Sequence, residues 1–280
     1  MHLALLLIGI VLAIVSRVLM LKTSSGVLSW HRSLSNFLVP PLLILSTALA
    51  IMMMGAEGTM FQRPVNHSGY GLALIIWVTV CWIVIQKSWS AWHLWQRIAT
   101  LPLYQSDDVS GRCLQTSVPF AGRVGIWRSQ LVISQGLIEN LTKREIEAVL
   151  VHEQAHEFYR DTFFFFVLGC VQRLFAWMPG TEILWNELLL LREIRADHWA
   201  AEKVEPLLLA ETLFKVVSLR LSSEQDLMIA FGEESTTGRL EQRINALLEL
   251  EPRNNPLHYS FIAGISIVGC IPLLTMLCHQ

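Results

Sequence analysis

The sequence is poor in charged residues: Asp, Glu, Lys and Arg make up 16% of its 280 residues, whereas 53% are hydrophobic. This balance lies outside the usual range of soluble globular proteins. The formal net charge is −2, and no basic tail or basic stripe is present, so the sequence gives no indication of direct nucleic-acid binding. It also contains no internal repeat and no low-complexity tract.

Cysteines are few and widely spaced. There are five of them, an odd number, and no two form a CxxC pair; they stand at positions 81, 113, 170, 270 and 278. Most of them lie within strongly apolar runs. We therefore interpret them as small hydrophobic residues and not as a disulfide framework or a cysteine metal site.

Long apolar runs are abundant. Four stretches approach or reach the roughly 20 residues that a helix needs to cross the hydrocarbon layer of a membrane: about 3–21, 37–56, 69–86 and 257–278. The first has no basic start and no small-residue cleavage site, so we predict a retained helix and not a signal peptide. Near its end, we expect Arg17 to extend towards the membrane interface.

The distribution of basic residues predicts an orientation for these spans. Basic residues follow the first and third spans (Lys22, Arg32, Lys87 and Arg97), while the loop after the second has only Arg63, close to Glu57. This bias predicts that 22–36 and 87–256 face the inside of the cell. The N-terminus, residues 57–68 and the C-terminus would then lie outside.

A fifth apolar run, residues 162–177, is shorter. Its uninterrupted part ends at Gln172 and Arg173, too early for a membrane crossing. We expect a buried helix of the inner domain. A helix that lies against the bilayer, with Trp177 at the interface, is the alternative.

Between the third and fourth predicted spans, residues 87–256 are the only region rich in polar residues. Aromatic residues recur at helical spacing at Trp89, Trp92 and Trp95, which is typical of a packing stripe or an interfacial belt. The segment 113–134 is β-branched and alternating, which predicts two or three short strands. Helices are expected afterwards, at 142–160, 162–177, 181–203, 206–221 and 238–250.

The stretch VLVHEQAHEFYRD, residues 149–161, carries a metal-binding pattern on a predicted helix. The helix begins with a capping box, Thr142 to Glu145. His152 and His156 are four residues apart, so both imidazoles share one face and can bind one ion. Glu153 follows the first histidine, where it can accept a proton from the attacking water.

A third ligand is predicted on the helix 181–203. Glu193 and Asp197 lie one turn apart on one face of that helix. Glu193 as a ligand and Asp197 as a hydrogen-bond partner of a ligating histidine would give a catalytic His2Glu zinc site with an open position. The alternative, two solvated carboxylates, is disfavoured because the pair follows an apolar LLLL run.

Several of these residues resemble those of a known family. The runs SVPFAGRVGIWRSQLVISQGLIENL, HEQAHEFYRD and EIRAD, together with Arg239-Leu-Glu-Gln-Arg243-Ile, are similar to BlaR/MecR-type integral-membrane gluzincin metallopeptidases. More distantly they resemble HtpX-type and CAAX-prenyl endopeptidases. The likeness covers about 105–250, and the four-span arrangement is similar too.

The resemblance implies a mainly α membrane protein: four transmembrane helices with an inserted α+β gluzincin domain that carries a small β-sheet. It implies one catalytic Zn²⁺ held by His152, His156 and Glu193, with Glu153 as general base. Asp197 and Asp161 would orient the histidines. A strand within 117–133 would pair with extended substrate.

From the resemblance we also expect three spans in 1–86, a cytoplasmic protease domain in 87–256 and a fourth span in 257–280, in a bacterial-type inner membrane. The chain has no penicillin-binding domain after the fourth span, so we expect no β-lactam sensing.

The expected function is signalling by cleavage of a cytoplasmic partner, such as a BlaI/MecI-like repressor, and of the protease itself. The alternatives are an HtpX-like quality-control protease and a non-catalytic receptor or scaffold. Whether the protein is a homodimer is left open by the sequence.

Overall fold

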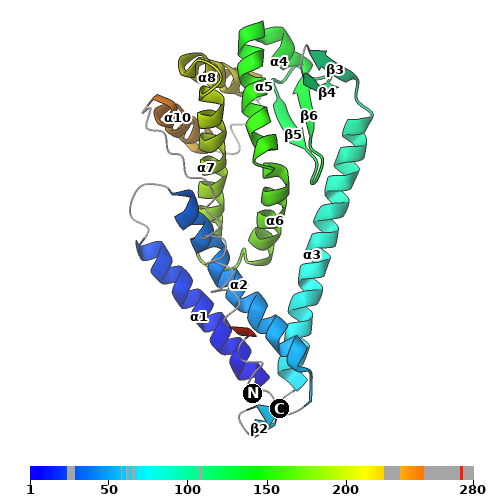
Figure 1. Ribbon diagram of the computed structural model, residues 1–280, viewed down its shortest axis with the longest axis vertical. Helices are drawn as coiled ribbons and strands as arrows, with labels where there is room; N and C mark the ends of the chain where they lie inside the picture. Colours follow the sequence, from blue (N-terminus) through cyan, green and yellow to red (C-terminus); the bar gives the residue numbers. More distant parts are fainter. Residues whose placement is uncertain are drawn as a thin grey trace. The chain divides into compact units, whose positions relative to one another are not determined.

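The computed structural model describes residues 1–23, 29–57, 59–60, 63–64, 67–106, 109–223, 234–248 and 272–273. Within these residues the chain is mainly helical and has one four-stranded sheet (Figure 1). The expected fold class, a largely helical membrane protein with a small sheet, is therefore confirmed. The predicted fourth span, 257–278, falls almost entirely outside the described residues.

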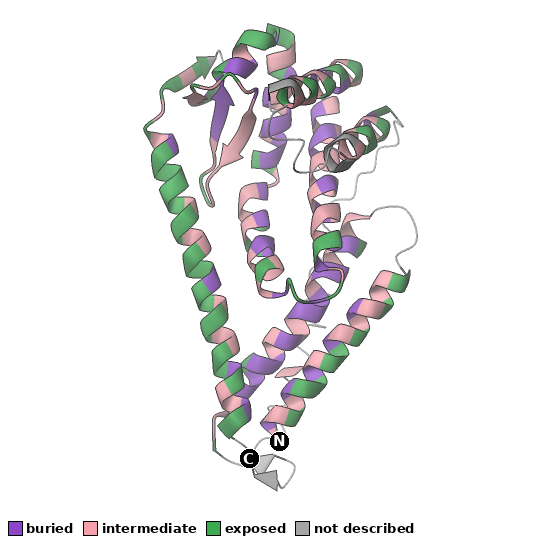
Figure 2. Cartoon of the chain, turned by 180° about the vertical axis from the view of Figure 1, so that it is seen from behind, coloured by how far each residue is buried: buried purple, intermediate pink, exposed green. Residues whose placement is uncertain are grey.

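The three N-terminal spans are present as helices. They are α1 (His2–Thr23), α2 (Trp30–Met54) and α3 (His67–Ala99), and each is long and apolar enough to cross a membrane. Many large apolar side chains on α1 and α3 are exposed (Figure 2). Exposed apolar surface of this extent on helices of spanning length indicates a membrane protein.

Helix α3 is longer than the span expected at 69–86. Its 33 residues form one continuous helix of about 50 Å, whereas a hydrocarbon layer is about 30 Å thick. The segment from Ser88 to Ala99, with its three tryptophans, thus continues the spanning helix.

Arg17 does not extend to an interface, and that prediction was wrong. Its side chain is fully buried, and its Nη2 donates a hydrogen bond to the carbonyl of Phe37 at 3.2 Å. Ala13, one turn earlier on α1, is buried in a core with Ile44 of α2. A hydrocarbon environment offers a guanidinium no hydrogen-bond acceptor. Arg17 therefore donates to a backbone carbonyl within the protein.

The chain divides into two compact units that differ from the continuous 87–256 domain expected from sequence. One unit contains Met1–Lys87 with Leu168–Leu189, and the other contains Ser88–Val167 with Leu190–Arg253. The boundaries run through helices α6 (Asp161–Leu174) and α7 (Thr181–Ala201). The turn that joins these two helices therefore belongs with the spans.

This turn packs against the middle of the first two spans. Phe175 and Met178 are buried together with Ala13 of α1 and Ile44 of α2. On α7, Glu187 accepts a hydrogen bond from Ser33 at 2.7 Å. In the run 162–177, the expected helix is present up to Leu174 as α6, and its place in the inner domain stays a prediction.

The second unit contains the sheet. Its strands are β3 (Leu103–Ser106), β4 (Val109–Leu114), β5 (Ala121–Val124) and β6 (Gln130–Ser134), in the order β3-β4-β6-β5. The β4–β6 pair is parallel and the other two pairs are antiparallel. The predicted strands within 113–134 correspond to β5, β6 and the end of β4, while β3 was not expected.

Among the described residues, four helices lie wholly within this unit: α4 (Gln135–Asn140), α5 (Lys143–Phe158), α8 (Pro206–Ser223) and α10 (Glu234–Leu248). Helix α5 begins with the predicted capping box, in which Thr142 and Glu145 each bond the other's backbone amide. Leu131 and Ile133 of the sheet share a buried core with Leu150 of α5. This core fixes α5 on the sheet, and with it the two histidines.

The passage from β6 into α4 requires a glycine. A Cβ atom at Gly136 would lie 1.9 Å from the carbonyl oxygen of Ser117. We expect Gly136→Ala to destabilise the protein by about 1–3 kcal/mol, because backbone must move to relieve the clash. A thermal melt in detergent measures this. Gly238→Ala on α10 is the control, since nothing lies near its Cβ, and equal melting temperatures for the two variants would contradict the prediction.

Candidate metal centre

Helix α5 presents the predicted motif as one buried group. His152, Glu153 and His156 are each at least about nine-tenths buried. The Nε2 atoms of the two histidines lie 3.2 Å apart. One helical turn separates the residues, so both imidazoles converge on one point beside the helix.

Glu193 of α7 completes a three-sided arrangement. Its carboxylate oxygens lie 3.4 Å from Nε2 of His152 and 3.8 Å from Nε2 of His156. All three ligand atoms fall within 4.8 Å of one another. Two atoms bound to one tetrahedral zinc ion at 2.0–2.1 Å lie about 3.3 Å apart, so this donor set fits zinc with one position open.

The other ring nitrogen of each histidine faces a carboxylate. Nδ1 of His152 lies 2.8 Å from Oδ1 of Asp197, and Nδ1 of His156 lies 2.8 Å from Oδ2 of Asp161. A proton on Nδ1 leaves the Nε2 lone pair directed into the centre. The structure thus places Asp197 and Asp161 where sequence reasoning expected histidine-orienting groups.

The backbone between α5 and α6 brings Asp161 to this position. Arg160 has a φ of +53°, a left-handed conformation that is uncommon for residues other than glycine. Helix α5 ends at Phe158 and α6 starts at Asp161, so only two residues separate the helices. Asp161 can therefore reach back to His156, five residues earlier.

Arginines neutralise the two buried aspartates. Arg243 of α10 donates from Nε and Nη2 to both oxygens of Asp197, at 2.7 and 2.8 Å. Arg195 of α7 pairs with Asp161 and stacks over the ring of Tyr159 at 4.0 Å. Sequence reasoning missed both roles, although Arg243 stands in the RLEQRI run that carried part of the family resemblance.

The Glu193 carboxylate is itself held by two guanidinium groups. Arg192 donates to Oε1 at 2.6 and 2.9 Å, and Nη1 of Arg243 lies 3.5 Å from Oε2. Arg192 also lies over the ring of Phe165. Arg243 therefore contacts both carboxylates of α7 that were predicted from sequence.

These charges set the protonation of the centre. Burial disfavours the protonated form of His152, but Asp197 and Glu193 outweigh it and raise the pKa of His152 to about 10. Burial would raise the pKa of Asp197, yet Arg243 and His152 hold that pKa below its usual value. At neutral pH the His152 ring of the metal-free centre is therefore an imidazolium, with a proton on each nitrogen. An incoming cation must displace one of these two protons.

Other acidic and histidine residues near the motif lie outside the centre. Glu157 is 57% exposed and pairs with Arg123 at 2.6 Å. Nε2 of His198 lies 3.0 Å from the backbone carbonyl oxygen of Ala246.

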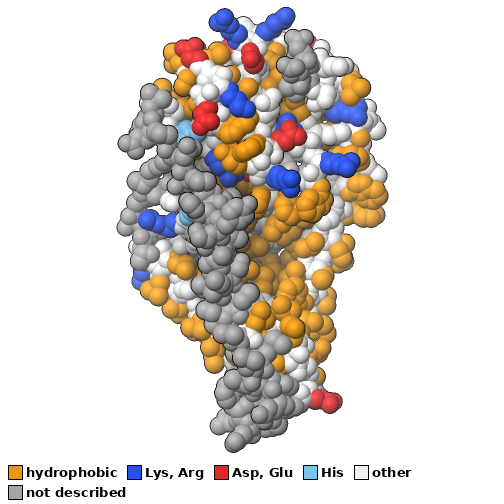
Figure 3. All heavy atoms as spheres, in the orientation of Figure 1, with side chains coloured by type: hydrophobic (Ala, Val, Ile, Leu, Met, Phe, Trp, Pro, Cys, Tyr) orange, Lys and Arg blue, Asp and Glu red, His pale blue; other side chains and the backbone are white. Residues whose placement is uncertain are grey.

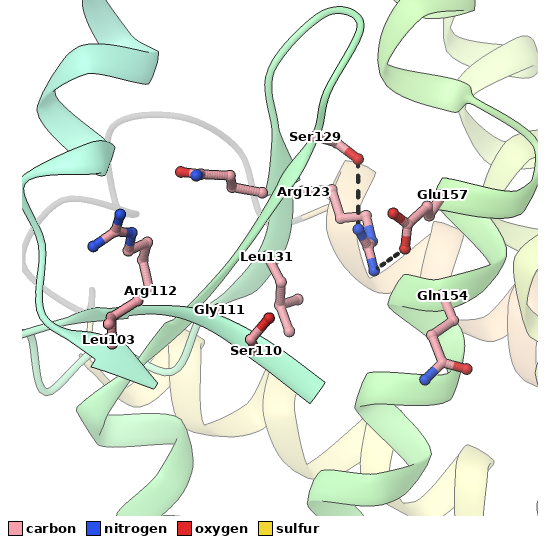
Figure 4. Close-up of a pocket in the computed structure, with 10 residues that line it drawn as sticks. Leu103, Ser110, Gly111, Arg112, Arg123, Ser129, Leu131, Gln154 and Glu157 are labelled. Carbon is pink, nitrogen blue, oxygen red and sulfur yellow. Dashed lines mark hydrogen bonds and ion pairs between the residues drawn. The ribbon is translucent and has the colours of Figure 1, made fainter. Parts of the chain in front are cut away.

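The edge strand β5 is bound to the motif helix by an arginine that sequence reasoning did not single out. Nε of Arg123 donates to the backbone carbonyl of Glu153 at 2.8 Å, and its Nη2 reaches Glu157. Figure 4 shows this side chain extending from the strand towards α5, at a pocket of about 460 Å³ that Gln154 also lines. Arg123 thereby fixes the spacing between the sheet edge and the metal centre.

The pair between Asp197 and His152 gives a direct prediction for metal affinity. Asp197→Asn keeps the shape of the side chain but removes the charge that supports the His152 Nδ1 proton. We expect zinc affinity to fall by about 10–100-fold, as measured by competition with a chromogenic chelator. Glu182→Gln, at the exposed start of the same helix, is the matched control. Equal affinities for the two variants would show that Asp197 has no such role.

Comparison with protein families gives a match over the region that contains the metal centre. Residues 113–251 match the model of Peptidase family M48, and the matched segment contains His152, His156 and Glu193. No curated protein and no solved structure matches the chain significantly. Peptidases of this family are zinc-dependent, in agreement with the donor set. Residues 113–251, just under half of the chain, are therefore similar to the zinc metallopeptidases of family M48.

Proposed function

We propose that the protein is a membrane-anchored zinc endopeptidase that hydrolyses a cytoplasmic protein partner. The observation that carries the proposal is the convergence of two histidine Nε2 atoms and the Glu193 carboxylate within 4.8 Å, next to the buried Glu153. A non-catalytic receptor or scaffold would have no need for this arrangement. The family match to a peptidase supports the same conclusion.

The chemistry follows from the residues around the centre. A bound zinc ion would supply a Lewis acid that polarises the scissile carbonyl and acidifies water. Glu153 would accept the proton of the attacking water and return it to the leaving amine. The Glu153 carboxylate is well buried, so bulk water and ions weakly screen its electrostatic interactions with the reacting groups.

The substrate would bind as an added strand at β5. In the described part of the sheet β5 pairs only with β6, so its other side is available for main-chain hydrogen bonds. Strand addition supplies affinity through the backbone and leaves sequence specificity modest. The expected edge within 117–133 corresponds to β5.

The charge bias of the loops supports an orientation with the protease domain in the cytoplasm of a bacterial-type cell and the N-terminus outside. In this orientation we propose a regulatory role, with a BlaI/MecI-like repressor as partner and self-cleavage as an accompanying reaction. The resemblance of the sequence motifs to BlaR/MecR-type peptidases supports this choice. HtpX-like quality control is the alternative, because an edge strand with modest specificity also accepts damaged proteins.

These two roles predict different substrates for the purified protein in detergent. A regulatory protease cuts a repressor encoded beside it at one site and leaves unrelated unfolded membrane proteins intact. A quality-control protease cuts the unfolded proteins at many sites. Mass spectrometry of the products distinguishes the outcomes, and cleavage of unfolded proteins alone would contradict the regulatory role.

Removal of the proton acceptor tests the enzyme class. We expect Glu153→Gln to lower peptide hydrolysis by about 10²–10⁴-fold, because the general base is lost. Zinc content should stay equal to wild type, since Glu153 is not among the converging ligand atoms. Glu157→Gln, one turn further along α5, is the control with activity retained. Undiminished hydrolysis by Glu153→Gln would refute the assignment.

Arg123 is expected to act as a positioning residue. Arg123→Lys keeps a positive charge near Glu157. A lysine cannot, however, form the ion pair with Glu157 and the hydrogen bond to the Glu153 carbonyl at the same time. We expect kcat to fall about tenfold, equivalent to roughly 1.4 kcal/mol, with zinc content unchanged. Glu157→Gln removes only an exposed ion pair and should change kcat little. If the two variants had equal kcat values, the carbonyl bond would have no positioning role.

A further inference from the structure

The last turns of α3 expose a row of tryptophans. Trp89 and Trp92 are 61% and 51% exposed, and Trp95 is exposed as well. Lys87 precedes this row and Arg97 follows it. Figure 3 shows apolar side chains crowded along the surface of α3. Such a row is energetically costly in water and is typical of a membrane interface.

The β5–β6 hairpin lies beside this row. Its tip, Gly125–Arg128, lines a shallow pocket of about 280 Å³ together with Ser88, Trp92 and Trp95 of α3. Trp127 at the tip is 77% exposed, the most exposed large apolar side chain among the described residues. Its ring stacks on Phe163 of α6 at 4.4 Å between centroids.

The conformation of the tip is specified locally. Gly125 has a φ of +134°, and a Cβ there would lie 2.4 Å from the carbonyl oxygen of Arg128. Thr162 of α6 donates a hydrogen bond to the carbonyl of Ile126. The turn geometry at Gly125 and the hydrogen bond from Thr162 thus fix the backbone that carries the exposed Trp127.

The position of the tip along α3 places it near the end of the span. The apolar run of α3 ends at Gln86, and a helix rises 1.5 Å per residue, so Trp89 and Trp92 lie about 5 and 9 Å beyond it. The headgroup layer adds about 5–8 Å on each side of the hydrocarbon. Tryptophan side chains concentrate in this layer, where the indole ring and its N–H are both accommodated.

We propose that the β5–β6 hairpin tip, through Trp127 and Arg128, docks into the headgroup layer of the bilayer that α3 spans. Continuity with the tryptophan row of the spanning helix identifies lipid, and not a protein, as the occupant. Arg128 is exposed next to Trp127, and with Lys87 and Arg97 it gives the surface a positive charge suited to anionic phospholipid.

This contact deepens the proposed function and rests on it for its consequence. Strand β5 ends at Val124, directly before the docked tip, so the substrate-binding edge starts at the membrane surface. The preferred substrates would then be extended segments that flank a transmembrane helix or a lipid anchor. The position of β5 at the membrane surface would not improve the binding of a fully soluble peptide.

Depth measurement tests the docking without reference to activity. A nitroxide label is attached after Trp127→Cys in the full chain with its five cysteines replaced by alanine, in nanodiscs of phosphatidylethanolamine and phosphatidylglycerol. We expect the label to collide more often with oxygen than with a water-soluble nickel chelate. Phe214→Cys, at an aromatic of α8 that is 60% exposed, is the control, with the opposite preference expected. Each labelled protein is used only after its zinc content matches wild type.

Two results would overturn the docking. One is nickel accessibility at position 127 equal to that at position 214. The other is shielding of position 127 from both reagents, which would mean that a protein covers it.

A second measurement compares Trp127→Ser with Phe214→Ser. For Trp127→Ser we expect a several-fold higher KM for a bilayer-tethered peptide and unchanged kinetics for the free peptide. Equal loss on both peptides would contradict the substrate class, whereas absence of Glu153-dependent hydrolysis in wild type would instead refute the proposed function.

Discussion

The pairing of each histidine Nδ1 with a buried carboxylate is the contact on which the site depends. His152 faces Asp197 and His156 faces Asp161, both at 2.8 Å, and so both Nε2 atoms point at one centre. The aspartates come from two different helices, α7 and the start of α6, and neither could stay charged in the interior without a partner. Arg243 and Arg195 supply those partners, so the metal centre draws α5, α6, α7 and α10 into one electrostatic network.

This network explains why helices that belong partly with the spans still serve the site. Helix α6 begins at Asp161 in the metal centre and ends at Leu174, which packs in the core with Phe175 and Met178. At the start of α7, Thr181 donates a hydrogen bond to the carbonyl of Phe175. Both helices therefore have residues in each of the two compact units.

Local patterns predicted the parts of the structure that depend on local spacing. The capping box at Thr142, the HExxH turn and the one-turn relation of Glu193 to Asp197 follow from helix geometry, and the structure has all three arrangements. Contacts between distant segments were not predictable in this way. Arg17 bonding Phe37, Arg123 bonding Glu153 and the α6–α7 turn packing on α1 and α2 each join residues at least 20 positions apart. For Arg243 the motif was visible, but not the partner that it would meet.

Zinc K-edge X-ray absorption of the purified full-length protein tests the central claim most directly, because it reports the ligand atoms themselves. The account predicts about one zinc per chain, with nitrogen and oxygen ligands at about 2.0–2.1 Å and multiple scattering from two imidazoles. One imidazole contribution should disappear in His156→Ala. Sulfur scattering near about 2.3 Å, or the absence of imidazole scattering, would contradict a centre built from His152, His156 and Glu193.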